Sequence, residues 1–508
     1  MYSKVNGFGL SGIEGFSVLV EADIQKGSPR IDIGGLPDAS TKEAKERVRS
    51  AIKNSGFLFT AKQITINLAP ADTKKEGSLF DLPIALAVLG GYGLISPNSL
   101  KENIVFIGEL SLDGYLRPVR GMLPLLISAS KLGFKKYVIP SGNALEASYI
   151  SGIEVFALNS LKDVVNFLSN QQAYSPIEYK DFKATNSKKQ FAQDFKFVRG
   201  QVFARRALEI AASGGHNILL IGPPGSGKTM LAKCLPTILP PMTVDEAMET
   251  TKIHSVAGIL ANDEGIVSAR PFRAPHHTAS QIAVTGGGSR AMPGEISLAH
   301  NGVLFLDELP EYPRNVLEIL RQPLEDKAIL ISRANRTVTY PADFMMVSGM
   351  NPCPCGNAGS SAKECTCSPM MINKYLSKLS GPLLDRIDMH IEVDNVTYED
   401  IKGAIGEDSN SIRERVNSAH VIQTTRYKNK GILRNSALTN EMLEIYCKLD
   451  DKSELLIKKA FDKLGLSVRA YTRILKVART IADLSNSENI QFAHITEALS
   501  YRCLDRKS

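Results

Sequence analysis

The amino-acid sequence predicts a multidomain α/β protein with a helical C-terminal part. Its 508 residues are too many for one hydrophobic core, and its 43% hydrophobic and 22% charged residues are typical of a globular protein. Short β-rich runs alternate with helical patterns up to about residue 165, and again between about residues 191 and 396. Beyond residue 397 the helical patterns predominate.

The first part of the chain has the patterns of a mixed sheet. Ser40 and Glu43 form a candidate capping box for a helix that extends to about Lys53. Residues 79–95 are the most apolar stretch, but an aspartate, a proline and three glycines interrupt it. A buried helix and turn are therefore expected there, and not a membrane span. The runs expected to form strands are residues 18–22, 31–33 and 64–68.

A polar stretch divides the chain. Residues 169–190 are rich in serine, asparagine, glutamine and lysine, which favours a linker. The predicted parts are residues 1–168, the linker at 169–190, a second α/β unit at 191–396 and a helical part at 397–508. The helices expected in the last part are residues 440–449, 453–464, 468–484 and 494–501.

Charge and cysteine content indicate the compartment and limit the partners. The net charge of +7 permits an anionic partner such as nucleic acid without requiring one. The first residues contain no long apolar region, so no signal peptide is expected. Seven cysteines without a secretion signal favour reduced thiols in a cytoplasmic protein that does not bind a membrane.

A phosphate-binding loop follows a predicted buried strand at residues 217–221. Its glycines allow backbone N–H groups to surround a phosphate, and the helix that begins near Lys228 adds the field of its N-terminus. Lys228 is expected to reach the β- and γ-phosphates of ATP, and the Thr229 hydroxyl is expected to bind Mg²⁺. The loop consists of Gly222, Pro223, Pro224, Gly225, Ser226, Gly227, Lys228 and Thr229.

Two acids end a second buried strand, at residues 303–306. Asp307 is the expected second Mg²⁺ ligand, and Glu308 is expected to polarise the water that attacks the γ-phosphate. A hydrophobic run that ends in Asp-Glu says little alone. Behind a complete phosphate loop it predicts an ATPase.

Four of the seven cysteines lie within fifteen residues and form two close pairs. Four thiolates in such an arrangement can bind Zn²⁺ tetrahedrally, although the C-x-C spacing is tighter than the common C-x2-C. The alternative is a reduced loop that binds no metal. The four residues are Cys353, Cys355, Cys365 and Cys367.

Several longer motifs resemble the magnesium-chelatase-like AAA+ ATPases, and within them the ComM/YifB branch. They are residues 275–277, 286–288, 293–308 and 381–388. The resemblance implies an N-terminal Lon-protease-like domain of the ribosomal S5 domain 2 type, a P-loop AAA+ core and a small helical lid. It also implies ATP-driven DNA branch migration by a hexameric ring during recombination of incoming DNA.

The resemblance assigns roles to further residues. It implies that Asn351 is a sensor that orients the lytic water, and that Arg386 is an arginine finger acting on the γ-phosphate of a neighbouring subunit. It gives Arg469 the role of a second sensor in the lid. Taken alone, either arginine is more typical of a surface or ion-pair residue. The paired histidines at residues 276–277 become structural parts of an insert, with metal binding as the alternative.

Residues 77–83 and 116–123 resemble the segments that carry the Ser–Lys dyad of Lon proteases. Leu79 stands where the serine would be, and Leu123 where the lysine would be. Ser78 is adjacent, but a shift of one residue at a helix start turns a side chain by about 100°. The first domain is therefore expected to be a non-proteolytic module for assembly or DNA contact.

Residues 328–340 are expected to form a β-hairpin with its turn near residues 335–336. In the ATPases that the chain resembles, such a hairpin points into the ring channel. Arg333 and Arg336 are therefore the first candidates for contact with phosphates of branched or single-stranded DNA, without sequence specificity. Arg270, Arg273 and Arg290 are second candidates.

Three functions share this ATPase core. The first is a DNA motor, the second a chelatase subunit that drives metal insertion into a porphyrin, and the third a protein-remodelling or regulatory ATPase. The Lon-like first domain favours the DNA motor, because chelatase subunits are not expected to carry it.

Overall fold

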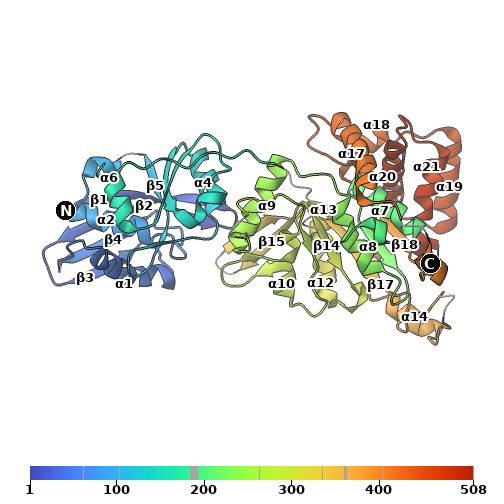
Figure 1. Ribbon diagram of the computed structural model, residues 1–508. Helices are drawn as coiled ribbons and strands as arrows, with labels where there is room; N and C mark the ends of the chain where they lie inside the picture. The colour runs from blue at the N-terminus through green and yellow to red at the C-terminus, as the bar shows by residue number, and fades with distance from the viewer. Residues whose placement is uncertain are drawn as a thin grey trace. The chain divides into compact units, whose positions relative to one another are not determined.

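The computed structural model describes residues 1–60, 62–101, 103–183, 193–261, 264–333, 336–359, 363–403 and 406–506. These residues form two compact units (Figure 1). Unit 1 contains Met1–Lys183 and Val244–Ser268, and unit 2 contains Ala184–Thr243 and Ala269–Ser508. The prediction of a multidomain α/β protein with a helical C-terminal part is confirmed. None of the helices in the described ranges has the length and apolarity that a membrane crossing requires.

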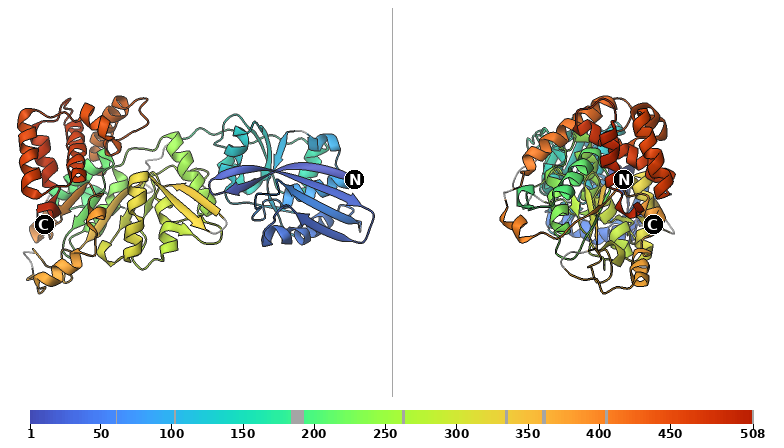
Figure 2. Two further views of the ribbon diagram at one scale, coloured as in Figure 1. Left: turned by 180° about the vertical axis from the view of Figure 1, so that it is seen from behind. Right: turned by 90° about the vertical axis from the view of Figure 1, so that its right-hand side faces the viewer.

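Unit 1 is built on a seven-stranded sheet with the order β3-β4-β2-β1-β5-β8-β9, in which β1 and β2 form a long central hairpin (Figure 2). The pairs β1–β2 and β2–β4 are antiparallel, and the other pairs are parallel. The three predicted strands lie in β2, β3 and β4. The strands of this unit are β1 (Tyr2–Ser11), β2 (Glu14–Gln25), β3 (Arg30–Gly34), β4 (Gln63–Ala69), β5 (Ile104–Phe106), β6 (Glu109–Leu110), β7 (Leu116–Arg117), β8 (Lys136–Pro140) and β9 (Glu154–Leu158).

Helix α2 is the buried helix expected within residues 79–95. Every residue in it except Gly90 is buried, and it packs against β1 and β2. Its continuous apolar sequence therefore reflects burial on all sides. The helices of unit 1 are α1 (Ala39–Asn54), α2 (Asp81–Gly91), α3 (Pro97–Lys101), α4 (Met122–Lys131), η1 (Ser141–Asn143), α5 (Ala144–Ala147), α6 (Leu161–Leu168) and α9 (Val244–Ala257).

The predicted capping residue of α1 is wrong. Asp38, and not Ser40, caps the helix: its carboxylate accepts the N–H of Thr41 at 2.7 Å. The same carboxylate accepts the N–H of Gly77 at 3.2 Å. This second contact comes from a distant part of the chain, and it anchors the carboxylate of Asp38 at the start of the helix.

Two segments belong to unit 1 although the sequence assigned them to the linker and to the second α/β unit. Residues 169–183, expected in the linker, lie along the unit: the N–H of Ile177 donates to the Val155 carbonyl at 2.8 Å. Residues 184–192, the remaining linker residues included, lie outside the described part. Helix α9 falls within the sequence of the second α/β part, yet it packs on α4, and the Ser255 hydroxyl donates to Glu146 at 2.8 Å.

Unit 2 contains a five-stranded parallel sheet with the order β11-β14-β17-β10-β18. Strands β10, β14 and β17 are buried throughout, which explains their uninterrupted apolar sequences. In parallel sheets, ligands bind beyond the carboxyl ends of the strands. The strands are β10 (Ile218–Ile221), β11 (Phe272–Arg273), β12 (Gly286–Gly287), β13 (Met292–Pro293), β14 (Val303–Leu306), β15 (Ala328–Arg333), β16 (Arg336–Pro341), β17 (Met345–Met350) and β18 (Met389–Glu392).

Short helices surround this sheet and carry the connections between its strands. They are η2 (Phe195–Phe197), α7 (Val202–Gly214), α8 (Lys228–Cys234), η3 (Leu235–Thr237), α10 (Gln281–Thr285), α11 (Glu295–Leu298), η4 (Leu309–Glu311), α12 (Arg314–Ile319), α13 (Arg321–Asp326), α14 (Pro369–Leu376) and α15 (Gly381–Leu384).

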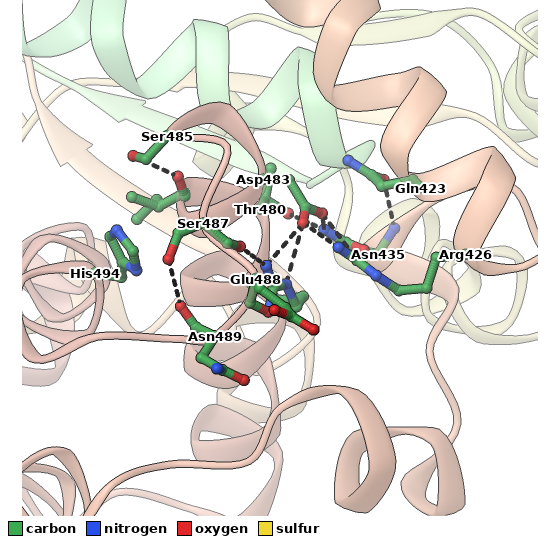
Figure 3. Close-up of polar contacts among 12 residues, drawn as sticks. Gln423, Arg426, Asn435, Thr480, Asp483, Ser485, Ser487, Glu488, Asn489 and His494 are labelled. Atoms are coloured by element: carbon green, nitrogen blue, oxygen red, sulfur yellow. Dashed lines mark hydrogen bonds and ion pairs between the residues drawn. The ribbon is translucent and has the colours of Figure 1, made fainter.

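The C-terminal part of unit 2 is helical, as predicted, and the four expected helices correspond to α18–α21 (Figure 1). A buried polar cluster links α17 to α20: the Asp483 carboxylate accepts hydrogen bonds from Arg426, Arg479 and Asn435 (Figure 3). The helices of this part are α16 (Tyr398–Lys402), α17 (Ser409–Arg426), η5 (Asn435–Ala437), α18 (Asn440–Tyr446), α19 (Asp451–Leu464), α20 (Val468–Leu484), α21 (Phe492–Ser500) and η6 (Cys503–Arg506).

Candidate functional site

The phosphate loop lies between the end of β10 and the start of α8. Gly225 and Gly227 have φ angles of 81° and 89°, in the left-handed region that favours glycine. At Gly222 a Cβ atom would lie 2.2 Å from the carbonyl oxygen of Val393, so no larger residue fits. The loop therefore has the backbone that a phosphate cradle requires.

Lys228 is buried at the first position of α8, and its ammonium group points into the loop. Nζ donates to the carbonyls of Gly222 at 2.7 Å and Pro223 at 2.9 Å, and to Asn351 Oδ1 at 3.3 Å. Burial lowers the pKa of Lys228, while the nearby carboxylates of Asp307 and Glu308 oppose that shift. The predicted phosphate-binding lysine and the predicted sensor Asn351 are thus in direct contact beside the phosphate loop.

The two predicted Mg²⁺ ligands also lie together. The Thr229 hydroxyl donates to Asp307 Oδ2 at 2.7 Å, and Asp307 Oδ1 accepts the N–H of Glu308 at 3.0 Å. Oxygen donors of these two types are the ligands that Mg²⁺ prefers, usually in combination with waters and substrate phosphates. The residues therefore fit the metal at the carboxyl edge of the sheet.

Glu308 contacts a residue that sequence reasoning placed among structural ones. Its carboxylate Oε2 lies 3.4 Å from Nδ1 of His277, and its side chain is 55% exposed. The backbone of Glu308 is left-handed, with φ 51° and ψ 47°, which is uncommon for a residue with a side chain. The paired histidines were visible in the sequence, but nothing local connected them to Glu308.

A cavity of about 540 Å³ opens beside Glu308 and Asn351. Lysines enter it from α14 and the turn that follows, and Lys378 Nζ lies 3.0 Å from Glu311 Oε1. The cavity borders the predicted water-activating carboxylate and the predicted sensor, but none of the described residues of the phosphate loop lines it. Its lining residues are Glu308, Glu311, Asn351, Pro354, Met371, Lys374, Tyr375 and Lys378.

The two predicted catalytic arginines share one carboxylate. Nη2 of Arg386 lies 2.8 Å from Glu325 Oε1, and Nη2 of Arg469 lies 3.3 Å from the same oxygen. The hydroxyl of Ser467, which caps α20, donates to Asp385 Oδ1 at 3.2 Å. Within the described residues, neither arginine forms a hydrogen bond or ion pair with the phosphate loop of its own chain.

Comparison with known proteins identifies the family. Three family models match: "Magnesium chelatase, subunit ChlI" over residues 194–401, "Subunit ChlI of Mg-chelatase" over 20–143, and "Magnesium chelatase, subunit ChlI C-terminal" over 406–502. The competence protein ComM of Haemophilus influenzae is 45% identical over 501 residues, which cover 97% of this chain and 96% of that protein. The YifB protein of Escherichia coli K12 is 42% identical over the same shares of the two chains.

This chain is a magnesium-chelatase-like AAA+ ATPase of the ComM/YifB branch. The family uses ATP and Mg²⁺, and the residues around Lys228, Thr229 and Asp307 fit both. Asn351 and Glu308 lie beside these residues.

This ATPase also resembles part of a protease. The Lon protease of Leptospira interrogans is 24% identical over 179 residues, which cover 34% of this chain and 21% of that protein. Leu79 and Leu123, at the predicted positions of the dyad, are both buried, and neither side chain can act as a nucleophile or base. The Ser78 hydroxyl donates to Glu109.

The four clustered cysteines of this ATPase are brought together. Their Sγ atoms all lie within 4.8 Å of one another, and all four thiols are free. The N–H of Ala358 donates to Cys353 Sγ at 3.3 Å, and the amides of Asn357 and Thr366 donate to Cys355. A Cβ atom on Gly356 would lie 2.5 Å from Pro224 Cδ, so this loop packs directly behind the phosphate loop.

The predicted hairpin of this ATPase is formed by β15 and β16, and Arg333 pairs with Arg336 in its register. Residues 334 and 335 and the side chains of both arginines lie outside the described part. Arg270 and Arg273 make internal contacts: Arg270 donates to the Asn301 carbonyl at 2.8 Å, and Arg273 Nε lies 2.6 Å from Glu295. Of the second candidates, Arg290 is exposed.

Proposed function

We propose that this ATPase assembles into a hexameric ring, as its family resemblance implies, and drives branch migration of DNA during recombination of incoming DNA. The observation that carries the proposal is the likeness to the competence protein ComM over 97% of the chain. Competence is the uptake and recombination of external DNA, so a motor on DNA junctions fits the name of that relative.

The arrangement of the site supports hydrolysis shared between subunits. Lys228 and the loop amides would hold the phosphates, and Thr229 and Asp307, which lie together, would hold Mg²⁺ to supply compensating positive charge. Glu308 accepts a proton from the attacking water, and Asn351 orients that water. The remaining requirement is a positive charge on the γ-phosphate.

In this proposal Arg386 supplies that charge to the neighbouring subunit, and Arg469 is a second sensor that reaches the γ-phosphate from the helical lid. They lie together on Glu325 and make no contact with their own phosphate loop in the described part of the chain. An arginine supplied in trans accelerates phosphoryl transfer by about 10³- to 10⁵-fold in other P-loop enzymes. Hydrolysis is then expected to depend on assembly, so the ATPase rate per chain should rise with protein concentration.

DNA contact is assigned to the β15–β16 hairpin. Its strands are joined at the Arg333–Arg336 pair, and the net charge of the chain is +7. Arginines that contact phosphates bind without reading sequence, and their affinity falls steeply with salt. Arg336→Glu is therefore expected to abolish DNA binding while leaving basal ATPase largely intact.

Strand exchange on a synthetic four-way junction tests the function. Wild-type protein with ATP should move the branch point, and Lys228→Ala protein should not. Stimulation of the ATPase by branched or single-stranded DNA supports the motor. ATPase activity that DNA does not change, together with absent strand exchange, would instead favour a chelatase subunit or a protein-remodelling ATPase.

A zinc ion in the four-cysteine cluster belongs to the same proposal. Two close thiol pairs with backbone N–H donors to sulfur have the donor set of a structural zinc site. Protein purified without chelator should contain about one zinc per chain, and Cys353→Ser should lose it. Cys447→Ser, which changes a buried cysteine outside the cluster, is the matched control. A zinc content far below one per chain in wild-type protein contradicts the site.

A further inference from the structure

The loop that contains the paired histidines lies against the water-activating end of the ATP site. It follows β11, and β11 pairs in parallel with β14, the strand that ends before Asp307 and Glu308. The Phe272 and Phe305 rings stack between these strands at 6.1 Å. The register of two neighbouring strands therefore brings the histidine loop level with Glu308.

A tyrosine fixes this loop in place. Tyr312, just after η4, is buried, and its hydroxyl donates to the Pro275 carbonyl at 2.5 Å. The Tyr312 ring also meets the His277 ring edge-on, with centroids 6.4 Å apart. Helix η4 begins immediately after Glu308, and Tyr312 immediately follows it. One short segment therefore carries Glu308 and also fixes the loop that contains His277.

The backbone of Glu308 is fixed, but its side chain has few restraints. The Glu308 carbonyl accepts the N–H of Glu311 at 2.8 Å, and the Glu308 N–H donates to Asp307. In the described part of the chain, His277 Nδ1 at 3.4 Å is the polar group that contacts the Glu308 carboxylate. A general base must be held within reach of the proton that it accepts, so this contact bears on the rate of hydrolysis.

We propose that His277 is a positioning residue for ATP hydrolysis, which holds the Glu308 carboxylate in the orientation that activates water. This rests on the role of Glu308 stated under the proposed function. His276 does not share it: its ring lies 4.2 Å from that of His277 at an angle of 33°, but its Nδ1 atom is hydrogen-bonded to the Thr278 hydroxyl at 2.8 Å. The two histidines of one motif therefore have different roles.

The chemistry of the contact suggests a selective set of variants. The amide nitrogen of an asparagine occupies about the same place as Nδ1 of a histidine, whereas that of a glutamine corresponds to Nε2. His277→Asn therefore keeps a donor near Glu308, and His277→Ala removes it. His276→Ala removes an equal side chain from the same loop and is the matched control.

The experiment measures ATP turnover and ATP affinity on the full-length protein without DNA. His277→Ala is expected to lower kcat about tenfold and to leave the Kd for ATP within about threefold, because His277 acts through Glu308 and not through the phosphates. His277→Asn should recover to within about threefold of wild type, and His276→Ala should stay within the same range. Adding His277→Ala to Glu308→Gln should cause no further loss, since the positioned group is already inactive.

Equal losses in His277→Ala and His276→Ala would show that the loop only needs to be folded, and the proposal would fail. An unchanged or higher kcat in His277→Ala, or independent losses in the double variant, would also overturn it. These measurements use no DNA. A failure of strand exchange would therefore contradict the proposed DNA motor and leave the test of His277 unaffected.

Discussion

The stability of the helical part of unit 2 is expected to depend on the Asp483 carboxylate. It is fully buried and accepts hydrogen bonds from Arg426 at 2.5 and 2.9 Å, from Arg479 at 2.9 and 3.2 Å, and from Asn435 at 2.8 Å (Figure 3). The cluster links α17, η5 and α20. Replacement of Asp483 by alanine removes the acceptor and leaves the donors inside the protein.

The expected cost follows from the burial of the arginines. The Arg479 side chain is 2% exposed, and the Arg426 side chain 17%. Breaking a buried ion pair by removing one partner costs about 3–5 kcal/mol, because a charge remains buried without compensation. Arg479 still donates to the carbonyls of Ser487 and Glu488, so the lower end of that range, about 3 kcal/mol, is expected for Asp483→Ala.

Hydrogen–deuterium exchange can measure this loss locally, without assuming that a two-unit protein unfolds in one step. Core amides of α17 and α20 in Asp483→Ala should exchange on the order of a hundredfold faster, which corresponds to about 3 kcal/mol. Amides of unit 1 provide an internal reference.

The matched control is Asp450→Ala, which removes an aspartate from the same helical part. Asp450 caps α19 by accepting the N–H of Ser453 at 2.8 Å, and loss of such a cap costs about 1 kcal/mol. If Asp483→Ala accelerates exchange no more than Asp450→Ala does, the buried cluster does not stabilise the helices as argued.

Three further predictions concern the ATP site and its sheet. Lys228→Ala should abolish ATP binding in a calorimetric titration, whereas Glu308→Gln should bind ATP normally and turn it over at least about a hundredfold more slowly; equal ATPase rates in wild type and Glu308→Gln would contradict the assignment. Glu325→Gln should raise kcat of the assembled protein about two- to fivefold, because Arg386 no longer leaves a carboxylate to reach phosphate; a fall in kcat would mean that Glu325 supports the arginine instead. Burial lowers the pKa of His390 to about 3, below its unfolded value near 6.5, so the stability that depends on neutral His390 is present above pH 6.5 and is lost as the pH falls. At pH 5 the loss is about 2 kcal/mol, and urea unfolding at pH 7 and 5 should show a smaller difference in His390→Leu than in wild type.

The sequence was sufficient for features that depend on neighbouring residues. An uninterrupted apolar run followed by a glycine-rich turn predicted β10 and the phosphate loop, because a fully buried parallel strand leaves no polar side. The same reasoning predicted β14 before Asp307. Helices α19 and α20 were predicted because one face of each is apolar at helical spacing.

Other features depend on contacts that no local pattern contains. Helix α17 is mostly polar, and its buried face includes Ser409 and Gln423 along with a few apolar residues. Its apolar periodicity is therefore weak. The start of α1 was misplaced because Asp38 and Ser40 are both good capping residues, and a contact with Gly77 anchors Asp38. The proximity of His277 to Glu308 required the register of β11 beside β14.

The shared contact of Arg386 and Arg469 with Glu325 bears on how a ring could transmit nucleotide state. Asp385 precedes Arg386 and accepts a hydrogen bond from Ser467, which caps the helix that carries Arg469. The segment that contains Asp385 and Arg386 and the start of α20 are therefore joined by two separate contacts. Movement of Arg386 toward a neighbour's phosphate cannot leave α20 unaffected unless both contacts break. If Arg386 acts on a neighbour as proposed, we expect the lid of one subunit to respond to the nucleotide of the next, because the Glu325 carboxylate contacts both Arg386 and Arg469.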